Sequence, residues 1–88
     1  IKVIELNNIS IYPNPSTGIF NFIFTSENVQ DLRLRIFNAI GEELLIDYLE
    51  EFTAKDTKQI NLKNYDKGIY FLEIKITNKI INKKLILN

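Results

Sequence analysis

Residues 68–77 read Gly-Ile-Tyr-Phe-Leu-Glu-Ile-Lys-Ile-Thr, and this stretch decides the fold. Apolar side chains recur at every second position, at Tyr70, Leu72, Ile74 and Ile76. Most of the side chains between them are charged or polar. Alternation with period two is typical of a strand that buries one face and exposes the other. The stretch therefore predicts a half-buried β-strand.

The same alternation recurs on both sides of this stretch. Residues 18–25 place Phe20, Phe22 and Phe24 on one face, and residues 31–38 separate three aliphatic side chains from Arg33 and Arg35. Further strands are predicted at residues 9–12, about 58–62 and 80–87. Nearly the whole chain thus follows the strand pattern.

Residues 42–52 fit two patterns. Five apolar side chains fall at helical spacing with glutamates on the opposite side, which is typical of an amphipathic helix. However, the segment directly follows a predicted hairpin turn and has strands on both sides. We therefore predict a strand from about residue 43 to 48, with the helix as the alternative.

Short turn motifs separate the predicted strands. Asn38-Ala39-Ile40-Gly41 predicts a type I turn with Gly41 in the left-handed region, and Asn78-Lys79 predicts a two-residue hairpin turn. Pro13-Asn14-Pro15-Ser16-Thr17-Gly18 predicts a rigid turn, because each proline fixes its own φ and restricts the residue before it. A further turn is predicted at residues 64–68.

Short strands at this spacing predict an all-β fold, an immunoglobulin-like β-sandwich of about seven antiparallel strands. The Asp66-x-Gly68-x-Tyr70 spacing is that of a tyrosine corner, in which the phenol closes the loop before the next-to-last strand. In the alternative interpretation, Asp66 and Gly68 only form a turn and Tyr70 only packs.

The composition excludes several classes of chemistry. The 88 residues include no Cys, His, Met or Trp, so thiol chemistry, disulfides, Cys–His zinc sites and histidine catalysis are excluded. There is no glycine-rich phosphate loop and no apolar run of transmembrane length. Loop oxygens of Asp56, Asn64 and Asp66 suit calcium but lack EF-hand spacing. We predict no catalytic residue, no cofactor and no metal.

Charge is unevenly distributed along a formally neutral chain. Residues 1–54 hold 3 basic and 8 acidic side chains, whereas residues 55–88 hold 8 basic and 3 acidic ones. After Glu73 only lysines follow, at positions 75, 79, 83 and 84. Such a basic end attracts an acidic partner, or alternatively guards an exposed strand edge against unwanted pairing. The lysines are too sparse to predict nucleic-acid binding.

Three motifs together resemble one known family. They are Ile11-Tyr12-Pro13-Asn14-Pro15-Ser16-Thr17-Gly18-Ile19-Phe20, Lys67-Gly68-Ile69-Tyr70-Phe71-Leu72-Glu73-Ile74 and Lys83-Lys84-Leu85-Ile86-Leu87. Their order and separation resemble the type A C-terminal sorting domain of the type IX (Por) secretion system of Bacteroidetes, from about residue 9 to 88. Two features depart from the family: the last turn lacks a glycine, and the chain ends Leu-Ile-Leu-Asn rather than in basic residues.

The resemblance implies an address label without enzymatic activity. Residues 1–8 would be a linker or first-strand extension from an upstream cargo domain in the same polypeptide, and residues 9–88 the sorting domain. The partners implied are the outer-membrane translocon of the type IX machinery and a sortase-like peptidase. The implied location is the periplasm in transit, then the cell surface or the medium. We expect a monomer without nucleic acid and without membrane insertion.

The motifs also supply candidate residues for recognition by the translocon. They are Pro13, Asn14, Pro15, Gly18, Gly68, Tyr70, Lys83, Lys84, Leu85, Ile86 and Leu87. The final strand is expected at a sheet edge, where a partner could extend it by β-augmentation while the lysines steer the encounter. In the alternative interpretation, the proline turn, Gly68 and Tyr70 have structural roles only.

Two other functions fit the same fold. An accessory carbohydrate-binding module would place Phe37, Tyr48, Tyr65 and Phe71, or three of them, coplanar on one open face. A structural immunoglobulin-like spacer of an extracellular enzyme would need no such surface. Position distinguishes the spacer, because a spacer can lie in mid-chain whereas a sorting domain must end its protein.

Overall fold

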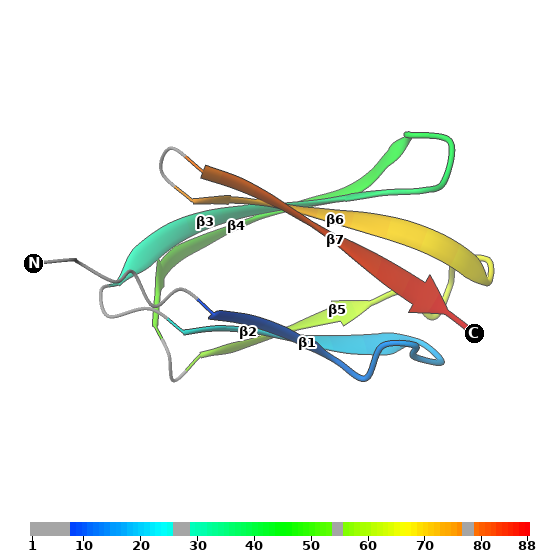
Figure 1. The fold of residues 1–88 in the computed structure, drawn as a ribbon, viewed down its shortest axis with the longest axis horizontal. Helices are drawn as coiled ribbons and strands as arrows, with labels where there is room; N and C mark the ends of the chain where they lie inside the picture. The colour runs from blue at the N-terminus through cyan, green and yellow to red at the C-terminus, as the bar shows by residue number, and fades with distance from the viewer. Residues whose placement is uncertain (1–7, 26–28, 54–55, 77–78) are drawn as a thin grey trace, which may run out of the picture.

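The computed structural model describes residues 8–25, 29–53, 56–76 and 79–88. These ranges contain seven strands and no helix. The strands are β1 (Asn8–Tyr12), β2 (Ile19–Thr25), β3 (Gln30–Phe37), β4 (Glu43–Phe52), β5 (Thr57–Asn61), β6 (Gly68–Ile76) and β7 (Lys79–Leu87). They form a three-stranded sheet in the order β1-β2-β5 and a four-stranded sheet in the order β4-β3-β6-β7, with antiparallel pairing throughout. The two sheets lie face to face (Figure 1), which confirms the predicted immunoglobulin-like sandwich.

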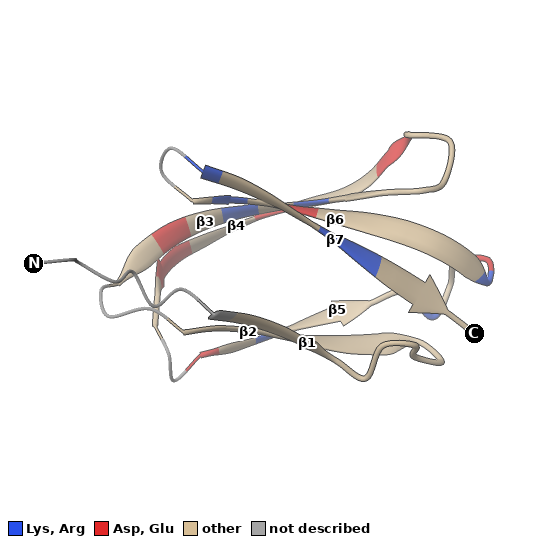
Figure 2. Ribbon diagram, in the orientation of Figure 1, with Lys and Arg blue, Asp and Glu red and all other residues tan. Residues whose placement is uncertain are grey.

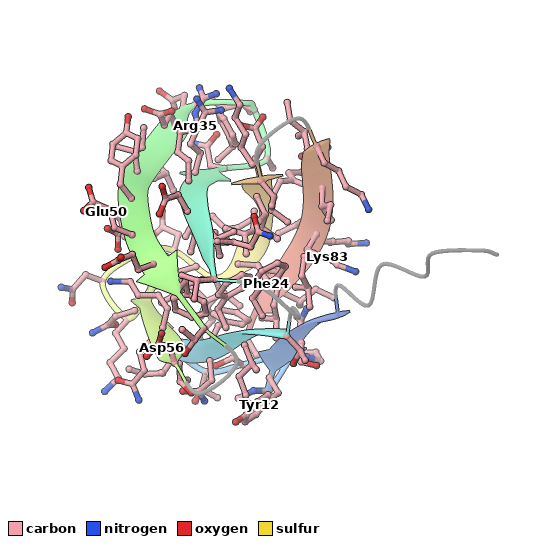
Figure 3. All side chains as sticks on the ribbon, turned by 90° about the vertical axis from the view of Figure 1, so that its left-hand side faces the viewer. Tyr12, Phe24, Arg35, Glu50, Asp56 and Lys83 are labelled. Carbon is pink, nitrogen blue, oxygen red and sulfur yellow. The ribbon has the colours of Figure 1, made fainter. Side chains whose placement is uncertain are left out.

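The core lies between the sheets and comes from the predicted alternation. Phe20, Phe22 and Phe24 of β2 are fully buried, and Figure 3 shows Phe24 inside the sandwich. Opposite them lie the buried aliphatic side chains of β3 and β6, which are Leu32, Leu34, Ile36, Leu72, Ile74 and Ile76. Burial of apolar surface at about 25 cal/mol per Å² is the main stabilising contribution in such a core.

Within residues 42–52, the segment Glu43–Phe52 forms strand β4, so the helical alternative is wrong. The register of β3 and β4 shifts between Ile36 and Phe37 and again between Gln30 and Leu32. Each shift inserts one extra residue into β4, which changes the phase of its inward face. Leu45 and Leu49 pair with inward-facing residues of β3 before the second bulge, and Phe52 is buried after it, so the apolar spacing resembles that of a helix. Leu45 is still 38% exposed.

A side chain of β3 stabilises the second bulge of β4. Glu51 adopts a positive φ of 51°, and its N–H donates to a carboxylate oxygen of Asp31 at 2.9 Å. The side chain of Asp31 thus satisfies a backbone donor that the bulge removes from the ladder. The strand also extends to Phe52, beyond the predicted end at about residue 48.

The hairpin turn after β3 is confirmed. Gly41 has a φ of 86°, and its N–H donates to the Asn38 carbonyl at 3.0 Å. The prediction that Lys79 belongs to the last turn is wrong, because Lys79 pairs with Ile76 and begins β7. The antiparallel ladder of β6 and β7 includes this residue, and Asn78 lies outside the described residues.

Candidate functional site

The opening proline turn lies against the end of the last strand. The side-chain amide of Asn14 donates from Nδ2 to the Lys84 carbonyl at 2.8 Å. Its Oδ1 accepts a hydrogen bond from the Ile86 N–H at 2.9 Å. A side-chain amide thus bonds to β7 in the way that a backbone unit of a neighbouring strand would.

Ser16 continues this contact with its backbone. Its N–H donates to the Ile86 carbonyl at 2.9 Å, and its carbonyl accepts from the Asn88 N–H at 2.8 Å. Ser16 also forms a parallel bridge with Leu87. The chain therefore leaves the three-stranded sheet after β1 and joins the edge of the four-stranded sheet, next to the C-terminus in Figure 1.

The two prolines explain why Asn14 and Ser16 make these bonds. Proline has no N–H, so Pro13 and Pro15 cannot donate to a neighbouring strand. The hydroxyl of Ser16, which is buried, donates to the Ile19 carbonyl at 2.5 Å and accepts from the Gly18 N–H at 3.1 Å. These bonds fix the turn from inside. We call residues 13–16 together with residues 84–88 the terminal clamp.

The clamp changes the expected role of the last strand. Leu85 and Leu87 are 0% and 4% exposed, so they belong to the core and present no apolar surface to a partner. Ile86 is half-buried on the opposite face of the sheet. The final strand lies at a sheet edge, as predicted, because β7 ends the order β4-β3-β6-β7. At residues 84–88, however, this edge is not free for a partner, because Asn14 and Ser16 already pair with backbone groups there.

The side chain of Lys84, within the clamp, and that of Lys83, next to it, are both exposed. Figure 2 shows basic and no acidic segments along β7, and Figure 3 places Lys83 where β7 lies above β1. A groove of about 220 Å³ lies between the two strands and is lined by Ile9, Ile11, Asn14, Lys83 and Lys84. Within the described ranges neither lysine forms an ion pair. This end of the molecule therefore presents positive charge beside a shallow hollow.

The predicted tyrosine corner is confirmed. The hydroxyl of Tyr70 donates to the Asp66 carbonyl, and the ring of Tyr65 packs edge-on at 6.4 Å from the Tyr70 ring. Gly68, between them in the chain, has a φ of 151°, which favours glycine, and pairs with Leu87. The corner therefore holds the start of β6 next to the end of β7.

Gly18 lies so close to the Lys63 side chain that a larger residue would not fit. A Cβ atom at this position would lie 2.5 Å from Cγ of Lys63, and the Gly18 carbonyl accepts from the Leu62 N–H at 2.8 Å. The structure thus gives Gly18, Gly68 and Tyr70 structural contacts, and it places Pro13, Asn14, Pro15, Lys83 and Lys84 on one exposed surface.

Replacing Tyr70 with Phe is expected to lower the free energy of unfolding by about 1 kcal/mol, because the hydrogen bond to Asp66 is lost. Burial, together with the charge of Asp66, raises the pKa of Tyr70. An unfolded tyrosine ionises near pH 10. The contribution of this raised pKa to the free energy of unfolding is therefore fully present below about pH 10. It is lost as the pH rises through the pKa of Tyr70 in the folded chain.

Urea titrations of both proteins between pH 7 and 12 test this expectation. The wild type should lose stability more steeply above pH 10 than Tyr70→Phe does. Both proteins contain the same lysines, so the difference between the two curves reports on Tyr70. Parallel curves would show that Tyr70 does not titrate differently in the folded chain.

The outer face of the four-stranded sheet carries a charged network that the alternation alone could not reveal. Arg33 lies 3.0 Å from Glu73, and Arg35 lies 3.2 Å from Glu73 and 2.5 Å from Glu43. The hydrogen bond that Arg35 donates to the Glu43 carboxylate raises the pKa of Arg35. The guanidinium of Arg35 also lies over the Phe37 ring, 4.8 Å from its centroid.

This network interrupts the aromatic surface that a sugar-binding module would need. Phe37 and Phe71 are direct cross-strand neighbours, but Arg35 covers the Phe37 ring. Tyr48 lies on the same face opposite Arg33, and Tyr65 packs instead against Tyr70. The four rings therefore do not gather into one open platform.

The remaining surface shows little that could perform chemistry. No group of three or more metal-ligating acidic side chains lies within residues 8–25, 29–53, 56–76 and 79–88. A hollow of about 270 Å³ between β4 and β5 is lined by apolar residues, by Gln59 and Asn61, and by the ion pair of Lys58 and Asp47. In the same part of the chain, no helix is long and apolar enough to cross a membrane.

The sequence marks Asn14 as a candidate residue but does not show what it binds, and it does not mark Ser16 as a candidate. A polar side chain fixed between two prolines was the available signal, since the prolines leave its amide as the nearest donor to the neighbouring strand. The partners are about 70 residues away in the chain, so only the fold reveals them.

A family model described as "Secretion system C-terminal sorting domain" matches residues 10–88. The match begins within β1 and includes the proline turn, the tyrosine corner and the whole of β7. No curated protein matches the chain.

Proposed function

Since the chain belongs to the family of secretion system C-terminal sorting domains, the signal of type IX (Por) secretion, we propose that it directs an attached cargo across the outer membrane. The cargo would precede the domain in the same polypeptide, joined through residues 1–8. It would pass through the periplasm and reach the cell surface or the medium.

The terminal clamp is the observation that best supports this proposal. The first and last motifs of the domain meet through bonds from Asn14 and Ser16 to β7. Both ends must therefore be made and folded before this surface exists. A translocon that bound the surface would accept only a complete, folded domain.

Two groups of candidate residues have different parts in this proposal. The exposed residues Pro13, Asn14, Pro15, Lys83 and Lys84 would contact the outer-membrane translocon. The others would hold the shape of that surface from the core, the corner and the turn; they are Gly18, Gly68, Tyr70, Leu85, Ile86 and Leu87. We assign no catalytic step to either group, so the domain acts by binding.

Later processing would fall outside the sandwich. A sortase-like peptidase would cut N-terminal to the proline turn, near residues 1–8 or upstream. The cargo would then be anchored at the cell surface or released. A cut there would leave every strand from β2 to β7 intact, so the removed domain would stay folded.

A fusion experiment tests the proposal. The chain is attached to the C-terminus of an exported fluorescent protein, and a second fusion places it between two exported domains. In a bacterium with an intact type IX system, the first fusion should reach the surface or the medium and the second should not. A structural spacer would give equal distribution for both fusions, and retention of both in the periplasm would refute the sorting function.

A further inference from the structure

The edge of β7 is closed at one end and open at the other. Along a strand, the N–H and C=O of one residue point to the same side, and successive residues alternate. The Ile86 N–H and the Lys84 carbonyl point toward Asn14. The backbone groups of Ile80 and Asn82, and the N–H of Lys84, therefore point outward in the same direction.

These outward groups have no partner within the described chain. The ladder with β6 uses the opposite side of β7, and the clamp ends at Lys84. Residues 80–84 thus offer a short open edge with a fixed end. We call this segment the open edge.

A strand added to the open edge would meet two different surfaces. Its inward side chains would face the groove lined by Ile9, Ile11 and Lys83. Its outward side chains would lie beside Lys84 and near Lys75, which is the cross-strand neighbour of Ile80. Every charged residue after Glu73 is a lysine.

The lysines restrict what can pair here. A second copy of the chain would bring its own lysines against these, and like charges on adjacent strands are destabilising. An acidic strand would be attracted to them instead. Main-chain hydrogen bonds would provide affinity, and the alternation of its side chains would provide specificity.

We propose that the open edge of residues 80–84 binds an extended segment of the secretion machinery as an added β-strand, with acidic and apolar side chains in alternation. The inference rests on the proposed sorting function and names the kind of partner. The terminal clamp limits the register, because Asn14 occupies the next acceptor along the edge.

The sharpest variant is Asn82→Pro, with Asn82→Thr as its control. Proline removes the outward N–H and places a ring at the edge, while the bonds of neighbouring residues to β6 remain. Thr keeps the N–H. If Asn82→Pro does not fold by circular dichroism, Ile80→Pro tests the same edge, because its N–H points the same way.

Reporter delivery gives the first reading. The fluorescent fusion carrying folded Asn82→Pro should lose at least tenfold in surface delivery, and the Asn82→Thr fusion should match the wild type. Equal delivery by both variants would overturn the inference and leave the sorting function intact. Failure of the wild-type fusion would instead count against the sorting function.

Peptide binding gives a reading that is independent of secretion. The probes are acetylated Glu-Val-Glu-Val-Glu-Val-Glu and the same peptide with Lys in place of Glu. The acidic peptide should shift the NMR amide signals of Ile80, Asn82 and Lys84 in the wild type and lose at least tenfold in affinity for Asn82→Pro. Equal binding of both peptides, or shifts that leave these three amides unchanged, would overturn the assignment of an acidic strand.

Discussion

Removing residues 83–88 is expected to unfold the domain and to leave an attached cargo in the periplasm. The segment contains Leu85 and Leu87, which are buried, and the backbone partners of Asn14 and Ser16. Loss of a buried leucine costs about 2–5 kcal/mol, and small domains are stable by only about 5–15 kcal/mol. Circular dichroism and urea titration should show no cooperative transition for the truncated chain.

The truncation therefore cannot distinguish loss of the sorting signal from loss of the folded structure. A substitution that keeps the domain folded is needed as well. Changing Lys83 and Lys84 together to Gln removes the positive charge and leaves every buried contact in place, because both side chains are exposed. This variant should keep the urea midpoint of the wild type and deliver less cargo. A truncated chain that still unfolds cooperatively near the wild-type midpoint would contradict the place of β7 in the core.

Phe22→Ala is the second change with a large expected effect. Phe22 is fully buried in the middle of β2, and its ring packs on Phe52 at 5.9 Å between centroids. Replacing a buried phenylalanine by alanine costs about 3–5 kcal/mol, since contacts are lost and a cavity remains. Urea titration should show this loss, and surface delivery of the reporter should fall with the folded fraction.

Phe71→Ala is the matched control for this change. Phe71 lies on the outer face and is 41% exposed, so its removal should cost under about 1 kcal/mol. Delivery of the Phe71→Ala reporter should stay near the wild-type level. If Phe22→Ala lowers stability as expected yet leaves delivery unchanged, the machinery does not read the folded sandwich.

The strands of the sandwich could be predicted because each of them buries one face. In β2, β3 and β6 a single period-two pattern extends from end to end, and the buried residues match it. The same holds for the hairpin at Gly41, where the turn needs a positive φ. The tyrosine corner could also be predicted, since its residues are close together in the chain.

Other features depend on contacts that the pattern of apolar residues does not encode. The two bulges of β4 shift the phase of alternation, so its sequence suits a helix as well as a strand. The terminal clamp joins residues about 70 positions apart through one side-chain amide and the backbone of Ser16. The sequence marked both motifs as separate candidates but could not show that they touch.

The link between the opening turn and the last strand is tested most directly by amide hydrogen exchange, followed by NMR on the wild-type chain. The amides of Ile86 and Asn88 should exchange slowly, because they donate hydrogen bonds to Asn14 and Ser16. Asn14→Ala should therefore speed exchange at Ile86. The amides of Ile80, Asn82 and Lys84 should exchange fast. Fast exchange at Ile86 in the wild type would contradict the terminal clamp. Slow exchange at Ile80, Asn82 and Lys84 would contradict the open edge.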